Sequence, residues 1–194
     1  MTLEHAILGF LDREPMTGYD LKTRCFDSTV GHLWTADQAQ IYRTLVRLSQ
    51  QGLVRSRTVA QRNKPDRRVF SITARGRTEL AAWLRRPQDL SPVRDPLLVQ
   101  LSLAAQLGDA EVLALLERTR EGYQARLDAL RAAQADRAAS GNAPDARSEA
   151  LYVMTLVAAM AAARTAVDWA DDCIDKVGRG LPPASPRSTH EGVT

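Results

Sequence analysis

The chain has 194 residues, of which 26 are Lys or Arg and 23 are Asp or Glu, so its formal net charge is +3. This length allows one large domain or two small ones. The most apolar run, residues 150–163, is too short to span a bilayer and precedes Arg164 and Asp168, so we predict no membrane segment. Cys25 and Cys173 belong to no CxxC motif and no signal peptide is evident, which predicts a cytoplasmic protein with reduced thiols.

Two short helices are predicted at the start of the chain. Residues 3–11 carry apolar side chains at helical positions, and Pro15 ends this segment. Thr17 is a favourable N-cap for a second helix, residues 17–26, and Asp20 stands where it completes a capping box.

Residues 35–54 form the most informative segment. Thr35 and Gln38 predict a capping box at its start, and Gly52 predicts its end. An apolar stripe at helical spacing consists of Ile41, Leu45 and Leu48. Amide, phenol and guanidinium groups lie largely off this stripe: Gln38, Tyr42, Arg43, Arg47 and Gln50. Such groups suit base edges and phosphates, although an ordinary amphipathic surface helix has the same pattern.

A hairpin and a fourth helix are predicted next. Residues 53–59 and 67–73 have the composition of strands, and Pro65-Asp66 in the segment between them is a turn signal. Thr73 is expected to cap a helix that ends near Arg86. The order helix, helix, helix, hairpin, helix is that of a winged helix-turn-helix domain, in which the third helix enters the major groove and the hairpin is the wing.

The distribution of charge supports this interpretation. Eight basic residues and one acid lie between Arg55 and Arg77, and residues 1–90 have a net charge of +6 while residues 91–194 have −3. A charge run is usually a solvated face, but a basic hairpin beside such a helix favours contact with DNA phosphates. The asymmetry and the prolines near residues 87–96 predict a joint between two lobes.

The second lobe is predicted to be entirely helical. A short helix over residues 95–107 ends at Gly108, and Asp109 is expected to cap a long helix with a nearly heptad apolar spacing. A last helix runs from about Asp145 to Val177, which corresponds to about 50 Å. A helix of this length needs a further apolar surface, which a second copy of the chain would provide; a monomeric bundle is the alternative.

Several segments, taken in order, resemble the PadR family of bacterial transcriptional regulators. They are AILGFLDREPMTGYDLKTR, GHLW, QIYRTLVRLSQQGLV and ITARGRTELAAWL, and RDPLLVQLSLA resembles the longer subgroup with a helical C-terminal dimerisation domain. The resemblance implies a dimeric repressor that leaves DNA when a small molecule or signal arrives. Ala39 and Arg43 stand where many members have glycine and proline, which leaves the base preference open.

The predicted DNA-binding residues come from the second helix, the third helix and the wing. They are Tyr19, Lys22, Gln38, Gln40, Tyr42, Arg43, Arg47, Arg62, Lys64 and Arg67. The resemblance implies a phosphate or groove contact for Tyr42 and a basic contact for Arg47, and packing or a backbone contact for Tyr19. We expect Tyr42→Ala and Arg47→Ala to weaken DNA binding without unfolding the protein.

The fold class is therefore mainly α with an α+β wing. The expected domains are a winged helix-turn-helix domain over residues 1–87, a helical dimerisation and possible effector domain over 95–177, and a disordered tail over 178–194. An effector cavity would be lined by Trp83, Tyr152, Met154 and Trp169, for which plain core packing is the alternative.

No catalytic motif is present, and the three histidines form no pair at ligand spacing, so neither an enzyme nor a cofactor or metal is expected. An acidic face near the end of the last helix consists of Asp168, Asp171, Asp172 and Asp175. A solvated surface, neutralisation by arginines of the DNA-binding lobe or of a partner chain, and metal binding are its three interpretations.

Three functions remain open. The first is a repressor, a homodimer on a palindromic duplex, that a small aromatic or drug-like effector releases. The second is a DNA-binding regulator without such an effector. The third is a helical protein-interaction module whose winged domain binds protein. None of them involves a membrane.

Overall fold

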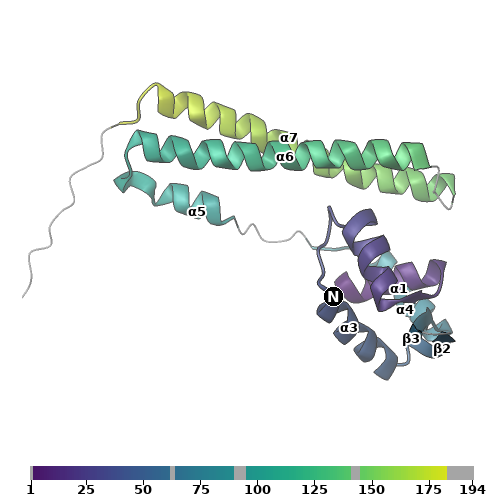
Figure 1. Ribbon diagram of the computed structural model, residues 1–194. Coiled ribbons are helices and arrows are strands. Elements are labelled where there is room, and N and C mark those ends of the chain that lie inside the picture. The colour runs from purple at the N-terminus through teal and green to yellow at the C-terminus, as the bar shows by residue number, and fades with distance from the viewer. Residues whose placement is uncertain (1, 62–63, 90–94, 141–144, 183–194) are drawn as a thin grey trace, which may run out of the picture. The chain divides into compact units, whose positions relative to one another are not determined.

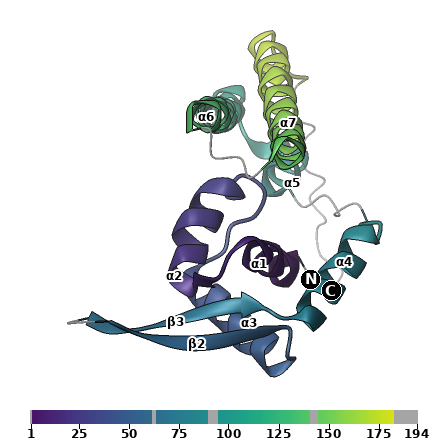
Figure 2. The ribbon, with the colours of Figure 1, turned by 90° about the vertical axis from the view of Figure 1, so that its right-hand side faces the viewer.

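The computed structural model describes residues 2–61, 64–89, 95–140 and 145–182. It divides into two compact units, Met1–Leu90 and Ser91–Thr194 (Figures 1 and 2). The first unit contains helices and a small antiparallel sheet, and the second contains helices, so the mainly α fold class is confirmed. Most of the predicted tail lies outside the described residues.

The first unit begins with helix α1 (Thr2–Arg13), the short strand β1 (Met16–Thr17) and helix α2 (Gly18–Asp20). The predicted capping box is present: Asp20 N donates to Thr17 Oγ1 (3.1 Å), and Thr17 N donates to Asp20 Oδ2 (3.0 Å). The chain then continues as a π-helix (Leu21–Thr29), which the sequence analysis did not predict. Buried Leu21, Cys25 and Phe26 follow a spacing of four to five residues, which suits its wider turn.

The third helix, α3 (Gln38–Gln50), begins later than predicted. Asp37 is its N-cap, because Gln40 N donates to Asp37 Oδ1 (2.7 Å) and Asp37 N donates to Gln40 Oε1 (3.1 Å). The predicted box of Thr35 and Gln38 is wrong by two residues, since the same pattern of cap and glutamine recurs at Asp37. Gly52 ends the helix as predicted and has a left-handed φ of 70°.

The sheet has three strands in the order β1-β3-β2, with β2 (Val54–Gln61) and β3 (Lys64–Ile72) forming the hairpin. The register pairs Val54 with Ile72 and Met16 with Phe70. The predicted turn at Pro65-Asp66 is wrong, because both residues belong to β3. The register shifts between Val59 and Gln61, and proline is tolerated at such a bulge.

Helix α4 (Ala74–Arg85) closes the first unit and begins as predicted, with Gly76 N donating to Thr73 Oγ1 (3.0 Å). A Cβ at Gly76 would lie 2.2 Å from Leu53 O, so this close approach requires glycine. Side chains of α1, the π-helix, α3, α4 and the sheet form one core. Its largest fully buried members are Phe70, Ile7, Leu8, Leu21, Ile41, Leu45 and Leu48.

The second unit consists of α5 (Pro96–Ser102), a 3₁₀ turn (Ala104–Gln106), α6 (Asp109–Ser140) and α7 (Ala146–Gly178). Helices α6 and α7 lie side by side along their length (Figure 1). They share two apolar clusters, one around Leu130 and Leu156 and one around Leu116 and Val177. The second unit is therefore a long two-helix hairpin with the short helix α5 at its start.

Two predicted boundaries in this unit are wrong. The predicted short helix ends at Ser102 and is followed by the 3₁₀ turn. Gly108, and not Asp109, caps α6, because Gly108 O accepts hydrogen bonds from Glu111 N (2.9 Å) and Val112 N (3.1 Å). The start of α7 agrees with the prediction, since Ser148 N donates to Asp145 Oδ1 (2.9 Å).

Helix α7 is also longer and more exposed than its apolar run indicates. By length and composition it could cross a membrane, whereas the run of residues 150–163 taken alone is too short. Only 17% of its most apolar window is buried in the structure. Apolar surface on α7 therefore lacks a cover within the described part of the chain.

Candidate nucleic-acid interface

Helix α3 presents two different faces. Ile41, Leu45 and Leu48 are fully buried, as the apolar stripe predicts. The opposite face is exposed and follows a spacing of i, i+3, i+4, i+7 and i+11; its members are Ala39, Tyr42, Arg43, Val46 and Gln50. The helix can therefore lie in a groove without disturbing the core.

One flank of this face is held by α2. A Cβ added to Gly18 would lie 2.6 Å from the Cζ atom of the Tyr42 ring, so the ring packs directly on the Gly18 backbone. Tyr42 still keeps 40% of its surface exposed, and the neighbouring Tyr19 keeps 60%. Both phenol groups therefore line one exposed part of the surface.

Replacing Gly18 by alanine is expected to weaken DNA binding with little loss of stability. The new methyl group must displace the end of the Tyr42 side chain, which is partly exposed and able to move. We expect a loss of about 1–3 kcal/mol in binding, as for one lost DNA contact. Gel-shift titration tests this, with Gly9→Ala as the matched control because a Cβ there meets nothing within 4 Å. Full affinity of Gly18→Ala would contradict the role given to Tyr42.

A pocket of about 440 Å³ lies beside Tyr42, between α2, α3 and the wing. It is lined by Thr17, Tyr19, Asp20, Tyr42, Asp66, Arg67 and Arg68. Arg67 Nη2 lies 3.2 Å from Asp20 Oδ2, so this ion pair links the wing to α2. Partial burial raises the pKa of Asp20, but its hydrogen bonds with Thr17 and the charge of Arg67 outweigh this, so the pKa lies below its usual value.

The other flank of α3 is held by α1. Arg47 Nε lies 2.5 Å from Glu4 Oε1, and the Glu4 side chain is only 8% exposed while that of Arg47 is 50% exposed. Glu4 Oε1 accepts no aligned hydrogen bond among the described residues, so the ion pair is what compensates its charge. Arg47, predicted as a DNA contact, therefore also has a structural role.

The other predicted DNA-binding residues differ in their surroundings. Lys22 forms an ion pair with Asp27, and Gln40 takes part in the capping box of α3. Gln38 and Arg43 are exposed, and no ion pair of Arg43 occurs in the described part of the chain. Lys64 begins β3, and Arg62 lies outside the described residues.

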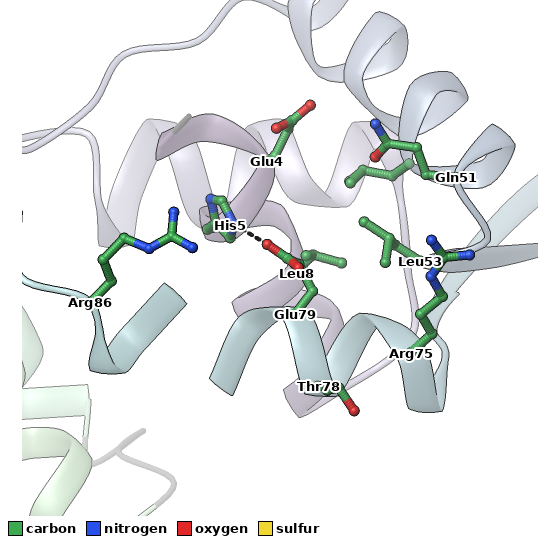
Figure 3. A pocket seen from close by; sticks show the side chains of 10 residues that line it. Glu4, His5, Leu8, Gln51, Leu53, Arg75, Thr78, Glu79 and Arg86 are labelled. Carbon is green, nitrogen blue, oxygen red and sulfur yellow. Dashed lines mark hydrogen bonds and ion pairs between the residues drawn. The ribbon is translucent and has the colours of Figure 1, made fainter. Parts of the chain in front are cut away.

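A second hollow, the α1–α4 pocket, lies on the side of α1 and α4 and has a volume of about 680 Å³. Its lining residues are Glu4, His5, Leu8, Leu48, Gln51, Leu53, Arg75, Thr78, Glu79 and Arg86 (Figure 3). His5 stacks on Trp83 with ring centroids 4.7 Å apart, and its Nε2 lies 3.3 Å from Glu79 Oε1. The pocket thus borders both Glu4 and the C-terminal end of α3.

The four residues predicted to line an effector cavity have different surroundings within their own units. Trp83 packs against the core of the first unit, whereas Tyr152 and Trp169 join two separate clusters of α6 and α7. Met154 is 64% exposed. Tyr152 instead lies against Arg137, whose guanidinium carbon is 4.6 Å from the ring centroid. Helical spacing alone does not separate Tyr152 from Trp169, because both lie on α7 and only tertiary packing assigns them to different clusters.

The remaining titratable groups include a buried thiol and the acidic face of α7. Within residues 2–182, gaps excepted, no three His, Cys, Asp or Glu side chains could hold a metal ion. Burial raises the pKa of the Cys25 thiol to about 11, which disfavours the thiolate form at neutral pH. On the acidic face, Asp171 pairs with Arg120 of α6 and Asp175 Oδ2 lies 4.0 Å from Arg179. Neutralisation by arginine thus occurs for these two within the second unit itself.

Each of the two units matches a known protein family. Residues 7–82 match the transcriptional regulator PadR-like family, and residues 93–177 match the virulence activator alpha C-term family. The chain is 32% identical over 129 residues to the negative transcriptional regulator PadR of Bacillus subtilis, which covers 66% of this chain and 70% of that protein. It is 46% identical over 94 residues to the probable transcriptional regulator Rv1176c of Mycobacterium tuberculosis, a match that spans 48% of each protein.

Solved structures agree with this grouping. The crystal structure of Bacillus subtilis PadR in complex with operator DNA matches with a TM-score of 0.78 and 26% identity, covering 91% of this chain and 99% of that one. The same protein in complex with p-coumaric acid has the same fold, with a TM-score of 0.74 and 23% identity over 92% of this chain and 99% of that one. The chain belongs to the PadR family, whose members are transcriptional regulators and not enzymes.

Proposed function

We propose that the chain is a sequence-specific DNA-binding regulator that places α3 in the major groove and lays the wing along the phosphate backbone. The observation that carries this proposal is the exposed face of α3, which carries Tyr42, Arg43 and Gln50 and lies beside a basic hairpin. Bacillus subtilis PadR, crystallised with operator DNA, supports it as a relative. Residues 1–87 would form the DNA-binding domain.

The wing supplies charge to this interface. Arg55, Arg57, Arg67 and Arg68 are all exposed. Arg68 Nε donates to Ser56 Oγ (3.0 Å), and its guanidinium carbon lies 5.1 Å from the Phe70 ring centroid, so the strands fix its position. Positive groups held on a rigid hairpin displace counterions from a duplex without reading its sequence.

We further propose that residues 95–177 form a homodimer through α7. Leu151, Met154 and Val157 share one side of this helix and are 52%, 64% and 52% exposed. A bilayer is a poor cover for this surface, because α7 also exposes Arg164 and Asp168. A second copy offers the matching apolar side, and a two-fold dimer would read a palindromic operator. We therefore expect a soluble cytoplasmic protein.

Control by a small molecule is the finer part of the proposal. Bacillus subtilis PadR was crystallised with p-coumaric acid, and the lining of the α1–α4 pocket here includes Arg75 and Arg86, two cations that suit the carboxylate of an aromatic acid. The pocket also borders Leu48 and Gln51 at the end of α3. A ligand that prefers a shifted α3 would lower DNA affinity, which is the action of a released repressor.

The first test is selection of bound duplexes from a random pool by the full chain. A DNA-binding regulator is expected to enrich one palindromic sequence and to bind it far more tightly than random duplex at the same salt concentration. Failure to enrich any sequence would overturn the proposal and leave the protein-interaction module in its place. A gel shift with the DNA upstream of the coding region then tests autoregulation.

The wing should act mainly through charge. Replacing Arg62, Lys64 and Arg67 together by alanine is expected to weaken binding to the selected and the random duplex alike. The slope of log affinity against log salt should become less steep by about 0.9 for each lost phosphate contact. Fluorescence anisotropy at several salt concentrations measures both. A loss confined to one base position, with an unchanged slope, would show that the wing reads sequence.

Linkage gives the test of effector control. If p-coumaric acid binds, its affinity for the protein should be lower when the selected duplex is bound, by the same factor as the ligand lowers duplex affinity, about 5- to 150-fold. Titration calorimetry with and without duplex measures both factors. Equal ligand affinity in the two titrations would favour regulation without this effector.

A further inference from the structure

The centre and the two flanks of the exposed face of α3 have different environments. On one flank Tyr42 packs on Gly18, and on the other Arg47 pairs with the buried Glu4. Both flanking side chains are therefore oriented by the fold. The residues between them are exposed and lie on the side of the helix opposite the core stripe; they are Ala39, Arg43, Val46 and Gln50.

Val46 is the larger of the two apolar members of this set. Val46 is 45% exposed, whereas Ile41, Leu45 and Leu48 of the same helix have no exposed surface. Ala39 lies two turns before Val46 on the same side, and Arg43 lies between them. The part of the helix that would face the floor of a groove thus combines small apolar groups with one guanidinium group.

The major groove presents one apolar group, the 5-methyl of thymine, and small aliphatic side chains are its usual contacts. A valine side chain has no charge and no hydrogen-bond donor, so it forms no favourable contact with a phosphate. Among the residues on this face, Val46 therefore gains the most binding energy from contact with a base edge and the least from contact with the DNA backbone. Tyr42 and Arg47, on the two flanks, suit contacts with the DNA phosphates. The basic wing beside the helix supplies the charge complementarity that brings a duplex to this surface.

We propose that Val46 is a specificity-determining residue that selects a thymine by contact with its 5-methyl group. This inference rests on the proposed DNA binding and adds the base that the helix prefers. Val46 contributes to sequence discrimination, and Tyr42 and Arg47 contribute affinity that depends little on sequence.

The test uses the full chain and the duplex that it selects from a random pool. Each thymine is replaced singly by uracil, which pairs identically and lacks only the methyl group. We expect one position in a half-site at which this change lowers affinity about three- to fivefold, the effect of one buried methyl group. Val46→Ala should lower affinity for the thymine duplex by a similar factor and make binding insensitive to uracil at that position.

Val59→Ala is the matched control, because Val59 is also exposed (36%) but lies on β2. It should leave the sensitivity to uracil unchanged. The inference is overturned if no thymine shows the effect, if Val46→Ala lowers affinity equally for the thymine and uracil duplexes, or if Val59→Ala abolishes the same sensitivity. A chain that binds no selected duplex would overturn the proposed function itself, which is a distinguishable result.

Discussion

Arg47→Ala is expected to destabilise the folded protein and not only its complex with DNA. The substitution leaves Glu4, a carboxylate with 8% exposure, without its cation. Losing one partner of a buried pair costs about 3–5 kcal/mol, and because Arg47 is half exposed and water reaches the pair, we expect about 2–3 kcal/mol. The expectation from the sequence alone is that this variant weakens DNA binding without unfolding the protein, and the structure adds a loss of stability to it.

Urea denaturation of the full chain measures this effect. Arg43→Ala is the matched control, since Arg43 lies on the same helix, is exposed and forms no ion pair in the described part of the chain; its effect on stability should stay within about 0.5 kcal/mol. Adding Glu4→Gln to Arg47→Ala should restore part of the lost stability, because a neutral amide replaces the buried charge. An Arg47→Ala variant with native stability would show that Glu4 is solvated and that Arg47 serves DNA alone.

Two charges on α7 are expected to abolish both the dimer and tight operator binding. Leu151→Asp and Val157→Asp change residues that are 52% exposed in the single chain, so the α6–α7 hairpin should still form. A partner surface would have to bury both carboxylates, which is too costly without cations to pair them. Loss of the second half-site should lower affinity for the palindrome by about 10²–10⁴-fold.

Light scattering gives the molar mass and anisotropy gives the affinity. Leu84→Asp is the matched control, because Leu84 is an exposed leucine (67%) on α4 in the first unit. It should leave the dimer intact. A dimer that persists in the doubly charged variant would move the interface away from this side of α7.

Local signals made the elements predictable. Thr17 and Thr73 cap their helices as expected, and the stripe of Ile41, Leu45 and Leu48 is buried. Where two local signals compete, the sequence does not separate them: Thr35 and Asp37 each precede a glutamine by three residues. In the structure Asp37 is the cap, and Ala36, between the two, is buried in the core. The strand β1 has two residues and no periodicity of its own, so only its pairing with β3 reveals it.

In the candidate interface, too, local patterns predict which residues are exposed but not which residues they contact. Tyr42 and Arg43 are exposed on the predicted face of α3 because that property follows from helical spacing. The partners of Arg47 and Arg67 do not follow from spacing, because Glu4 and Asp20 lie on other helices and meet them only in the folded chain. The α1–α4 pocket likewise arises from three elements brought together, which no local pattern encodes.

The anchoring of α3 at both edges makes its outward positions open to redesign. Tyr42 on Gly18 and Arg47 on Glu4 fix the helix, so substitutions at residues 39, 43, 46 and 50 change an exposed surface without touching these supports. Exposed substitutions of this kind usually alter stability by less than about 0.5 kcal/mol. A library randomised at these four positions should therefore yield mostly folded proteins, and new operator preferences could be obtained, in nature or in the laboratory, with the supports of the helix unchanged.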